Sequence, residues 1–304
     1  MRVEVGLLGP VELRLDGVPV PLGGAPQRVL LARLALAAGR VVAVGDLIGA
    51  LWDGEPPDNA VGNLHSYVSR LRRLTGGAAI VREPAGYRLD LPPGAVDVQR
   101  AEQLAADAGG LQAALGLWRG DPLADVADRL AFAPDVARLA EWRRHLCEEN
   151  LDHLLGTGRA AEALPEIEAL ATVEPMRERP HLLLIRALHQ TGRTAEALAA
   201  ARTFRDRIVD GHGVDPSPAF ADLHRRVLLD DPALRPASPA RSRPNRFFGR
   251  ATEQAALRDA LTAGRVIPLV GPGGVGKTRL MTETRTGGEF LVELAELSVP
   301  GDVP

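Results

Sequence analysis

A helix-forming stretch from about residue 58 to residue 74 contains the run Asn63-Leu64-His65-Ser66-Tyr67-Val68-Ser69-Arg70-Leu71-Arg72-Arg73. Each residue of a helix turns about 100° around the axis, so Leu64, Val68 and Leu71 fall on one side. The polar residues Asn63, Ser66, Arg70 and Arg73 lie about 150° away from them. The stretch therefore predicts a helix with an apolar core face and a basic outer face.

The outer face carries residue types that suit DNA. Arginine, asparagine and serine can contact base edges in a major groove, and arginine can also hold phosphates. A face that is merely solvated by water is the alternative interpretation, because exposed arginines are common on soluble helices. The residues on either side of this helix favour the first interpretation.

Short strands and two more helices are predicted before this helix, and a hairpin after it. Alternating apolar residues at positions 3 to 7 and 11 to 15, with Asp16-Gly17 before Val18-Pro19-Val20, are typical of antiparallel strands joined by a tight turn. Helical patterns cover residues 27–38 and 46–52. Ile80-Val81-Arg82 and Tyr87-Arg88-Leu89 flank Glu83-Pro84-Ala85-Gly86, which indicates a closing hairpin. This order predicts a winged helix-turn-helix of the OmpR-like α+β kind over residues 1–94.

The charge differs between three parts of the chain. Residues 1–96 hold 10 arginines against 9 acidic residues, residues 97–235 hold 17 against 23, and residues 236–304 hold 9 basic residues against 7 acidic ones. An acidic middle part is a poor surface for a polyanion, so any contact with nucleic acid is expected in the first part.

A repeated heptapeptide marks the middle part. The run Gly158-Arg159-Ala160-Ala161-Glu162-Ala163-Leu164 recurs as Gly192-Arg193-Thr194-Ala195-Glu196-Ala197-Leu198, with six of seven residues identical at an offset of 34. That offset is the tetratricopeptide period, in which small alanines let helices stack closely and leucines fill the seam. We predict a TPR-like all-α domain over residues 97–231, either a groove for a protein partner or a helical spacer.

The last part contains a phosphate-loop motif. Residues 232–246 are rich in proline, alanine and arginine and are interpreted as a semi-rigid linker. The run Gly271-Pro272-Gly273-Gly274-Val275-Gly276-Lys277-Thr278 follows an apolar strand pattern and precedes a helical one. In a complete domain its backbone N–H groups would cradle ATP phosphates, Lys277 would reach the β- and γ-phosphates, and Thr278 would bind Mg²⁺. The predicted nucleotide-binding residues are Gly271, Gly273, Gly274, Val275, Gly276, Lys277 and Thr278.

Only 26 residues follow Thr278 in this chain. Residues 247–304 are therefore interpreted as the N-terminal part of an incomplete P-loop α/β domain, in which little nucleotide binding is expected. The magnesium-holding acid and the water-positioning group that hydrolysis needs cannot be assigned there. The seven histidines are scattered and the single cysteine, Cys147, has no zinc-site partners, so the sequence indicates no enzyme. Because the sequence shows neither a signal peptide nor a membrane-spanning apolar run, a cytoplasmic protein without membrane contact is expected.

The order of these segments resembles the SARP regulators of actinobacteria, the AfsR/DnrI/RedD group, and in particular their longer members with an appended nucleotide-binding domain. The resemblance covers nearly the whole chain. Its pieces are residues 47–52, the Pro56-Pro57 pair, residues 67–73, 86–89, 114–120 and 174–179, the repeat at residue 192, and residues 213–218. Residues 97–231 resemble the bacterial transcriptional activation domain of that family.

The resemblance implies a transcriptional activator, for example of antibiotic or other secondary-metabolite genes. Its winged helix would bind direct repeats in double-stranded promoter DNA, its protomers would sit side by side, and its helical domain would help recruit RNA polymerase holoenzyme. DNA binding would need no cofactor. By resemblance, the third helix is the recognition element, and the DNA-contacting residues are Asn63, Ser66, Ser69, Arg70, Arg72, Arg73, Arg82 and Arg88.

Two departures from the family pattern concern helix ends. Val61-Gly62 stands where Arg-Asn is common, and the glycine should cost the helix roughly 0.5 to 1 kcal/mol relative to alanine. Ala43 stands where a serine cap is common, which weakens that helix end by about 1 kcal/mol.

Two other classes of function compete with the activator. A nucleotide-driven signalling switch, in which DNA binding is secondary, would follow from the phosphate loop. A repeat scaffold with a protein partner and no DNA selectivity would follow from the 34-residue repeat.

Overall fold

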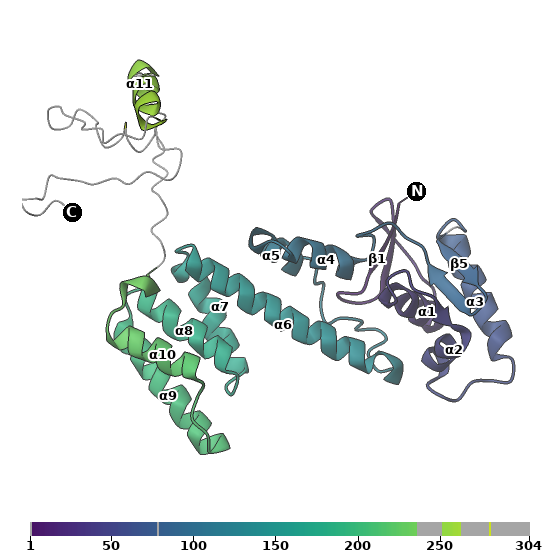
Figure 1. Ribbon diagram of the computed structural model, residues 1–304. Helices are drawn as coiled ribbons and strands as arrows, with labels where there is room; N and C mark the ends of the chain where they lie inside the picture. The colour runs from purple at the N-terminus through teal and green to yellow at the C-terminus, as the bar shows by residue number, and fades with distance from the viewer. Residues whose placement is uncertain (1, 78, 236–250, 263–279, 281–304) are drawn as a thin grey trace, which may run out of the picture. The chain divides into compact units, whose positions relative to one another are not determined.

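The computed structural model of the chain describes residues 2–77, 79–235, 251–262 and 280 (Figure 1). The chain divides into two units, residues 1–239 and residues 240–304. The first unit is mainly helical and contains two small antiparallel sheets.

The first sheet has the order β1-β2-β3 and contains the predicted alternating strands, β1 (Val3–Gly6), β2 (Glu12–Leu15) and β3 (Val18–Val20). All its pairs are antiparallel. Asp16 and Gly17 form the turn between β2 and β3 with φ angles of 50° and 84°. Two consecutive positive φ angles suit the twist of a tight hairpin, and Asp-Gly is among the pairs that tolerate them. The predicted turn is confirmed.

Three helices follow, α1 (Ala25–Leu36), α2 (Val44–Trp52) and α3 (Ala60–Leu74). Helix α1 begins two residues before the predicted start because Pro26 fits the first turn of a helix, where its missing N–H group is not needed. It ends before Ala38, whose φ of 51° is not helical. At the start of α2, Ala43 makes no side-chain hydrogen bond to the helix, as predicted for a position without a serine cap.

The second sheet has the order β4-β6-β5 and contains the predicted hairpin, β5 (Ile80–Glu83) and β6 (Gly86–Leu89). The additional strand β4 (Val42–Ala43) was not predicted, because two residues are too few to show an alternating pattern. A side chain at Gly86 would collide with the carbonyl oxygen of Val42, so glycine is required for the close approach of β4 and β6.

The N-terminal strands and helices share one hydrophobic core with the first part of the helical segment. That segment begins with α4 (Asp97–Ala105), the 3₁₀ helix η1 (Ala108–Gly110), α5 (Leu111–Leu115), the 3₁₀ helix η2 (Leu130–Phe132) and α6 (Ala133–Gly156). Buried residues from Val3 to Leu146 belong to this core, among them Leu111, Phe132 and Leu139.

Hydrogen bonds join residues 7–11 to the helical segment. The backbone N–H groups of Leu7 and Leu8 donate to the Asp97 carboxylate at 2.8 and 2.9 Å, and the N–H group of Val11 donates to Asp125 at 2.8 Å. The Arg119 guanidinium lies 3.2 Å from the Asp97 carboxylate. Burial raises the pKa of Asp97 above its ordinary value of 3.8, although these donors oppose the change.

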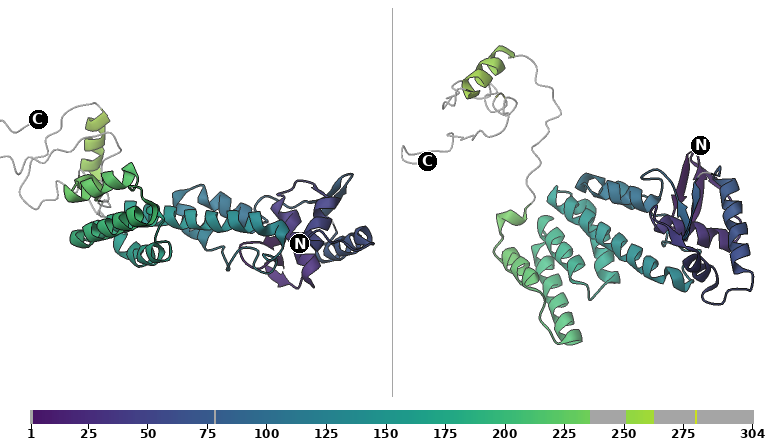
Figure 2. Two further views of the ribbon diagram at one scale, coloured as in Figure 1. Left: turned by 90° about the horizontal axis from the view of Figure 1, so that it is seen from below. Right: turned by 45° about the vertical axis from the view of Figure 1, so that its right-hand side comes forward.

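A second core lies among α7 (Ala160–Val173), α8 (Glu178–Gln190), α9 (Thr194–His212), α10 (Pro218–Leu228) and the 3₁₀ helix η3 (Pro232–Leu234), to which the end of α6 contributes Leu151 and Leu155. Figure 2 shows these helices, in teal and green, from two further sides. Ion pairs tie α6 to α8 and to the residue before it. Glu148, which is 1% exposed, lies 2.7 Å from Arg177, and Arg186 lies 2.5 Å from Asp152.

The repeated heptapeptides start α7 and α9 in the same way. Arg159 and Arg193 are the residues before the two helices, and each guanidinium hydrogen-bonds to the glutamate three residues later, Glu162 and Glu196. Ala163 and Ala197 are fully buried at equivalent positions. The 34-residue sequence repeat is therefore also a repeat in structure, and its alanines pack closely as predicted.

In the second unit the structure describes α11 (Ala251–Thr262). The predicted phosphate loop, residues 271–278, lies outside the described residues, as does most of the predicted linker. Among the helices that the structure describes, none is long and apolar enough to cross a membrane.

Candidate nucleic-acid interface

Helix α3 has the two faces that its sequence predicts. Leu64, Val68 and Leu71 are buried in the core, each no more than 2% exposed. Ser66, Ser69, Arg70 and Arg73 are exposed. The core residues hold the helix in place, and its outer face is open to solvent.

Three of the predicted arginines are free to bind a polyanion. Arg70 and Arg73 lie on the exposed face of α3, and Arg82 is exposed on β5. Within the described parts of the chain, none of the three has an ion pair or a side-chain hydrogen bond. A guanidinium without a carboxylate partner can bind phosphate or a base edge without first breaking an internal contact.

Arg72 and Arg88 are engaged within the protein instead. The Arg72 Nε donates to the carbonyl oxygen of Ile80 at 2.8 Å, and its guanidinium carbon lies 5.9 Å from the centre of the Tyr87 ring. Arg88 lies 2.7 Å from the Asp90 carboxylate and 3.5 Å from Glu83. Arg72 thus fixes the β5–β6 hairpin against α3, and the charge of Arg88 is largely balanced.

The predicted polar residues of α3 also differ in their surroundings. The Ser66 hydroxyl donates to the carbonyl oxygen of Gly62 at 3.0 Å, and its lone pairs stay open to a donor. Ser69 is exposed and Asn63 is half-buried. Gly62, a departure from the family pattern, lies one turn before Ser66 on the outer face and is half-buried beside the Asn59 side chain.

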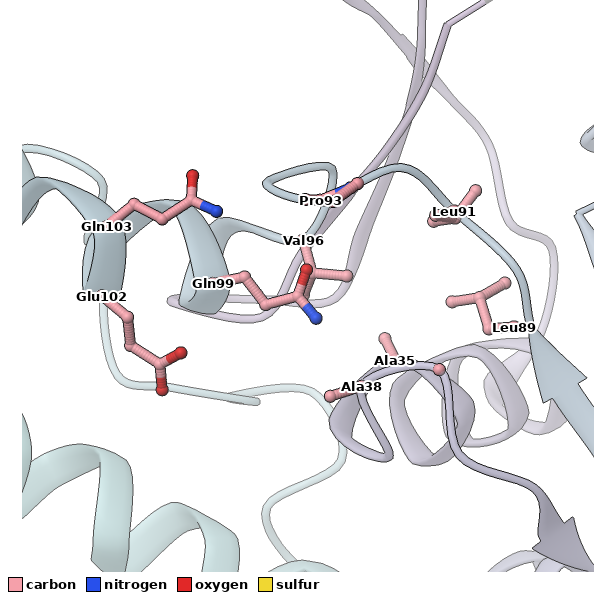
Figure 3. Close-up of a pocket in the computed structure, with 10 residues that line it drawn as sticks. Ala35, Ala38, Leu89, Leu91, Pro93, Val96, Gln99, Glu102 and Gln103 are labelled. Atoms are coloured by element: carbon pink, nitrogen blue, oxygen red, sulfur yellow. The ribbon is translucent and has the colours of Figure 1, made fainter.

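A cavity of about 510 Å³ lies between α1, the segment after β6, and α4. Figure 3 shows apolar side chains from α1 and from the segment after β6, together with Gln99, Glu102 and Gln103 of α4. These side chains include no nucleophile paired with a base. No group of three or more metal-binding side chains occurs in the residues that the structure describes. The exposed basic face of α3 is therefore the better candidate for a functional site.

Comparison with known proteins shows which regulators the chain is similar to. A profile of the family described as Bacterial transcriptional activator domain matches residues 93–228, which include α4 to α10. The regulatory protein DnrI of Streptomyces peucetius is 34% identical over 76% of this chain and 94% of its own length. The chain belongs to the SARP family of transcriptional regulators.

The SARP relatives differ in length. The regulatory protein AfsR of Streptomyces coelicolor is 41% identical over 91% of this chain, but the chain spans only 32% of AfsR. The solved structure of Mycobacterium tuberculosis EmbR, in complex with a low-affinity phosphopeptide, has a TM-score of 0.69 and 33% sequence identity. It covers 88% of this chain, which spans 72% of the EmbR chain. AfsR and DnrI are both named as regulatory proteins.

Proposed function

We propose that this chain is a sequence-specific DNA-binding transcriptional activator whose residues 1–94 form a winged helix-turn-helix. The supporting observation is the outer face of α3, where Arg70 and Arg73, which have no partner among the described residues, lie beside serines on a helix that the core holds in place. Helix α3 would enter the major groove, and the β5–β6 hairpin would be the wing.

The surroundings of each side chain suggest its role. Arg70, Ser66 and Asn63 are the candidates for base contacts, and Ser69 and Arg73 complete the same face. Arg82 on the hairpin is a candidate for phosphate contact. Arg72 would position the wing rather than touch DNA, because its guanidinium already bonds the hairpin. Arg88 would contact phosphate only if its ion pair with Asp90 were broken.

Residues 97–231 would serve as the TPR-like activation domain, with residues 232–246 as a linker. The match to the Bacterial transcriptional activator domain and the repeated α7 and α9 supply the support. In this proposal, protomers bind direct repeats side by side and help recruit RNA polymerase holoenzyme. Genes of antibiotic or other secondary metabolism would be the targets.

A nucleotide-regulated switch is the second candidate. Its support is the motif at residues 271–278 and the similarity to AfsR over 91% of the chain. In a complete domain ATP and Mg²⁺ would bind there through Lys277 and Thr278. If Lys277→Ala abolishes ATP binding and leaves DNA selectivity unchanged, nucleotide binding would be a regulatory function separate from DNA recognition.

Selection of binders from random duplex DNA at near-physiological salt tests the main proposal. The intact chain is expected to enrich a direct repeat. Arg70→Ala should lose about 1 to 3 kcal/mol of discrimination, the value of a good bidentate base contact. Arg205→Ala, an exposed arginine of α9 without a described ion pair, is the matched control and should leave the enriched sequence unchanged.

Weak and unselective binding that fades as salt rises would contradict the proposal. That outcome would reflect phosphate contacts alone. It would favour the repeated helices and a protein partner as the functional surface.

A further inference from the structure

A second cavity, of about 360 Å³, lies among helices α7, α8 and α9. Its walls include the apolar residues Ala171, Leu184, Ala200 and Phe204. This volume falls in the range of small-molecule sites, which are mostly apolar and carry a few polar groups that fix the ligand. One polar atom of this cavity, in the side chain of His181, lacks a hydrogen-bond partner among the described residues.

His181 of α8 lines this cavity and is only 6% exposed. Its ring stacks on Phe204, with 4.2 Å between the ring centres. The Nε2 atom of His181 is buried and has no hydrogen-bond partner among the described residues. Burial of a polar atom without a partner is unfavourable, so a ligand that hydrogen-bonds to Nε2 would offset this cost.

The charges around the cavity favour an anion. The Arg207 guanidinium of α9 stands at the cavity and donates to the carbonyl oxygen of Pro175 at 3.3 Å, and within the described chain it has no carboxylate partner. Glu168 is the acidic residue among those that line the cavity, and Arg193 lies 3.6 Å from its carboxylate. Among the described residues, the cavity therefore has an exposed arginine without a carboxylate partner close to a buried imidazole nitrogen without a hydrogen-bond partner.

From this arrangement we propose that the cavity binds a carboxylate carrying a short apolar tail. Arg207 and His181 bond the carboxylate, while Leu184 and Phe204 pack against the tail. The carboxylate comes either from a small metabolite or from the C-terminus of a partner peptide. This inference does not depend on DNA binding, because no residue of the cavity lies in residues 1–94.

Titration calorimetry on the intact chain tests the proposal with hexanoate as the probe. Hexanol and hexylamine, which have the same tail but no carboxylate, are expected to bind at least about tenfold more weakly, because they lack the charge-assisted hydrogen bonds to Arg207 and His181. Arg207→Gln should weaken hexanoate binding by a similar factor. Arg205→Gln, two residues earlier in α9, should leave it unchanged. His181→Phe keeps a ring for Phe204 to stack on and should also weaken binding, with circular dichroism confirming that the helices remain.

A short peptide ending in leucine, with a free or an amidated C-terminus, distinguishes the two sources. Preference for the free-carboxylate peptide over hexanoate assigns the cavity to a partner chain, and preference for hexanoate assigns it to a metabolite. Equal binding of hexanoate and hexanol, equal effects of Arg207→Gln and Arg205→Gln, or no binding of any carboxylate would each overturn the proposal.

Discussion

Gly62 lies on the outer face of α3, where it leaves the helix less stable than alanine would. The three atoms nearest to a side chain placed there all belong to the side chain of Asn59, which makes no capping hydrogen bond to α3 and can move. We expect Gly62→Ala to raise the free energy of unfolding by about 0.5 kcal/mol. This is about half of the full helix-propensity difference, because the Asn59 side chain must move. Urea denaturation measures the change.

Gly49→Ala in α2 is the matched control, because a side chain at Gly49 has open space around it. Gly49→Ala should give the full gain of roughly 1 kcal/mol. A loss of stability in Gly62→Ala alone would show that Asn59 is held in place by more than its described contacts.

His181 makes the stability depend on pH. Burial lowers the pKa of this histidine below its ordinary value of 6.5, and the nearby Arg207 guanidinium lowers it further. As pH falls below about 6.5, the unfolded chain gains a proton that the folded chain binds less readily. Stability should therefore fall with decreasing pH, by at most about 1.4 kcal/mol per pH unit, until the folded-state pKa is reached.

Unfolding by urea at pH 7 and at pH 5 measures this dependence. His181→Phe should reduce the difference between the two pH values. His145→Gln, at an exposed position of α6, should show the same difference between the two pH values as the original chain. Equal pH dependence in all three chains would assign the effect to other groups.

At the level of elements, the ion pairs that join α6 to α8 and to the residue before α8 depend on the buried carboxylate of Glu148. Arg177 lies 2.7 Å from it, and Arg179 lies 3.6 Å away. The hydrogen bond to Glu148 raises the pKa of Arg177 still further above its usual range, with help from Glu141. Arg177→Ala would leave the buried charge with only the weaker contact, so we expect a loss of about 3 kcal/mol in the free energy of unfolding.

Two variants show whether the burial of Glu148 causes the expected loss of stability in Arg177→Ala. Arg144→Ala removes surface ion pairs with Glu141 and Glu174 and should cost less than about 1 kcal/mol. The double variant Glu148→Gln, Arg177→Met removes both charges and should cost less than Arg177→Ala alone. A double variant as unstable as the single one would show that packing, not the unpaired charge, carries the loss.

The helices and strands were largely predictable, whereas their exact ends were less so. Helix α3 was predicted from the periodic spacing of Leu64, Val68 and Leu71, and the β5–β6 hairpin from the two short segments that flank residues 83–86, because both are local features. Strand β4 was missed because its two residues acquire strand geometry only by pairing with β6. The resemblance to SARP regulators, which comparison then confirmed, rested on many short segments in order.

On the scale of the whole molecule, residues 1–94 and α4 to α6 share a core and a set of hydrogen bonds. Leu111, Phe132 and Leu139 complete the core around the N-terminal elements, and Asp97 receives the N–H groups of Leu7 and Leu8. We expect a fragment of residues 1–96 to unfold at a lower temperature than residues 1–235 and with less cooperativity, because it exposes this shared apolar surface.

Thermal unfolding followed by far- and near-ultraviolet circular dichroism compares the two fragments. If residues 1–96 unfold cooperatively at the same temperature as the longer fragment, the N-terminal block is a self-sufficient domain. The hydrogen bonds of Asp97 would then serve to orient the two parts rather than to stabilise them.

The sequence by itself determined the three helices and, apart from β4, the strands of residues 1–94, together with the core face of α3 and the 34-residue repeat, because each of these follows from the spacing of neighbouring residues along the chain. Only the tertiary structure decided which arginines are free. Arg72 and Arg73 are adjacent in the sequence, yet a turn of about 100° per residue directs Arg72 to the hairpin and leaves Arg73 in solvent. The partners of Asp97 and the cavity at His181 likewise depend on residues brought together from distant parts of the chain, which local periodicity does not encode.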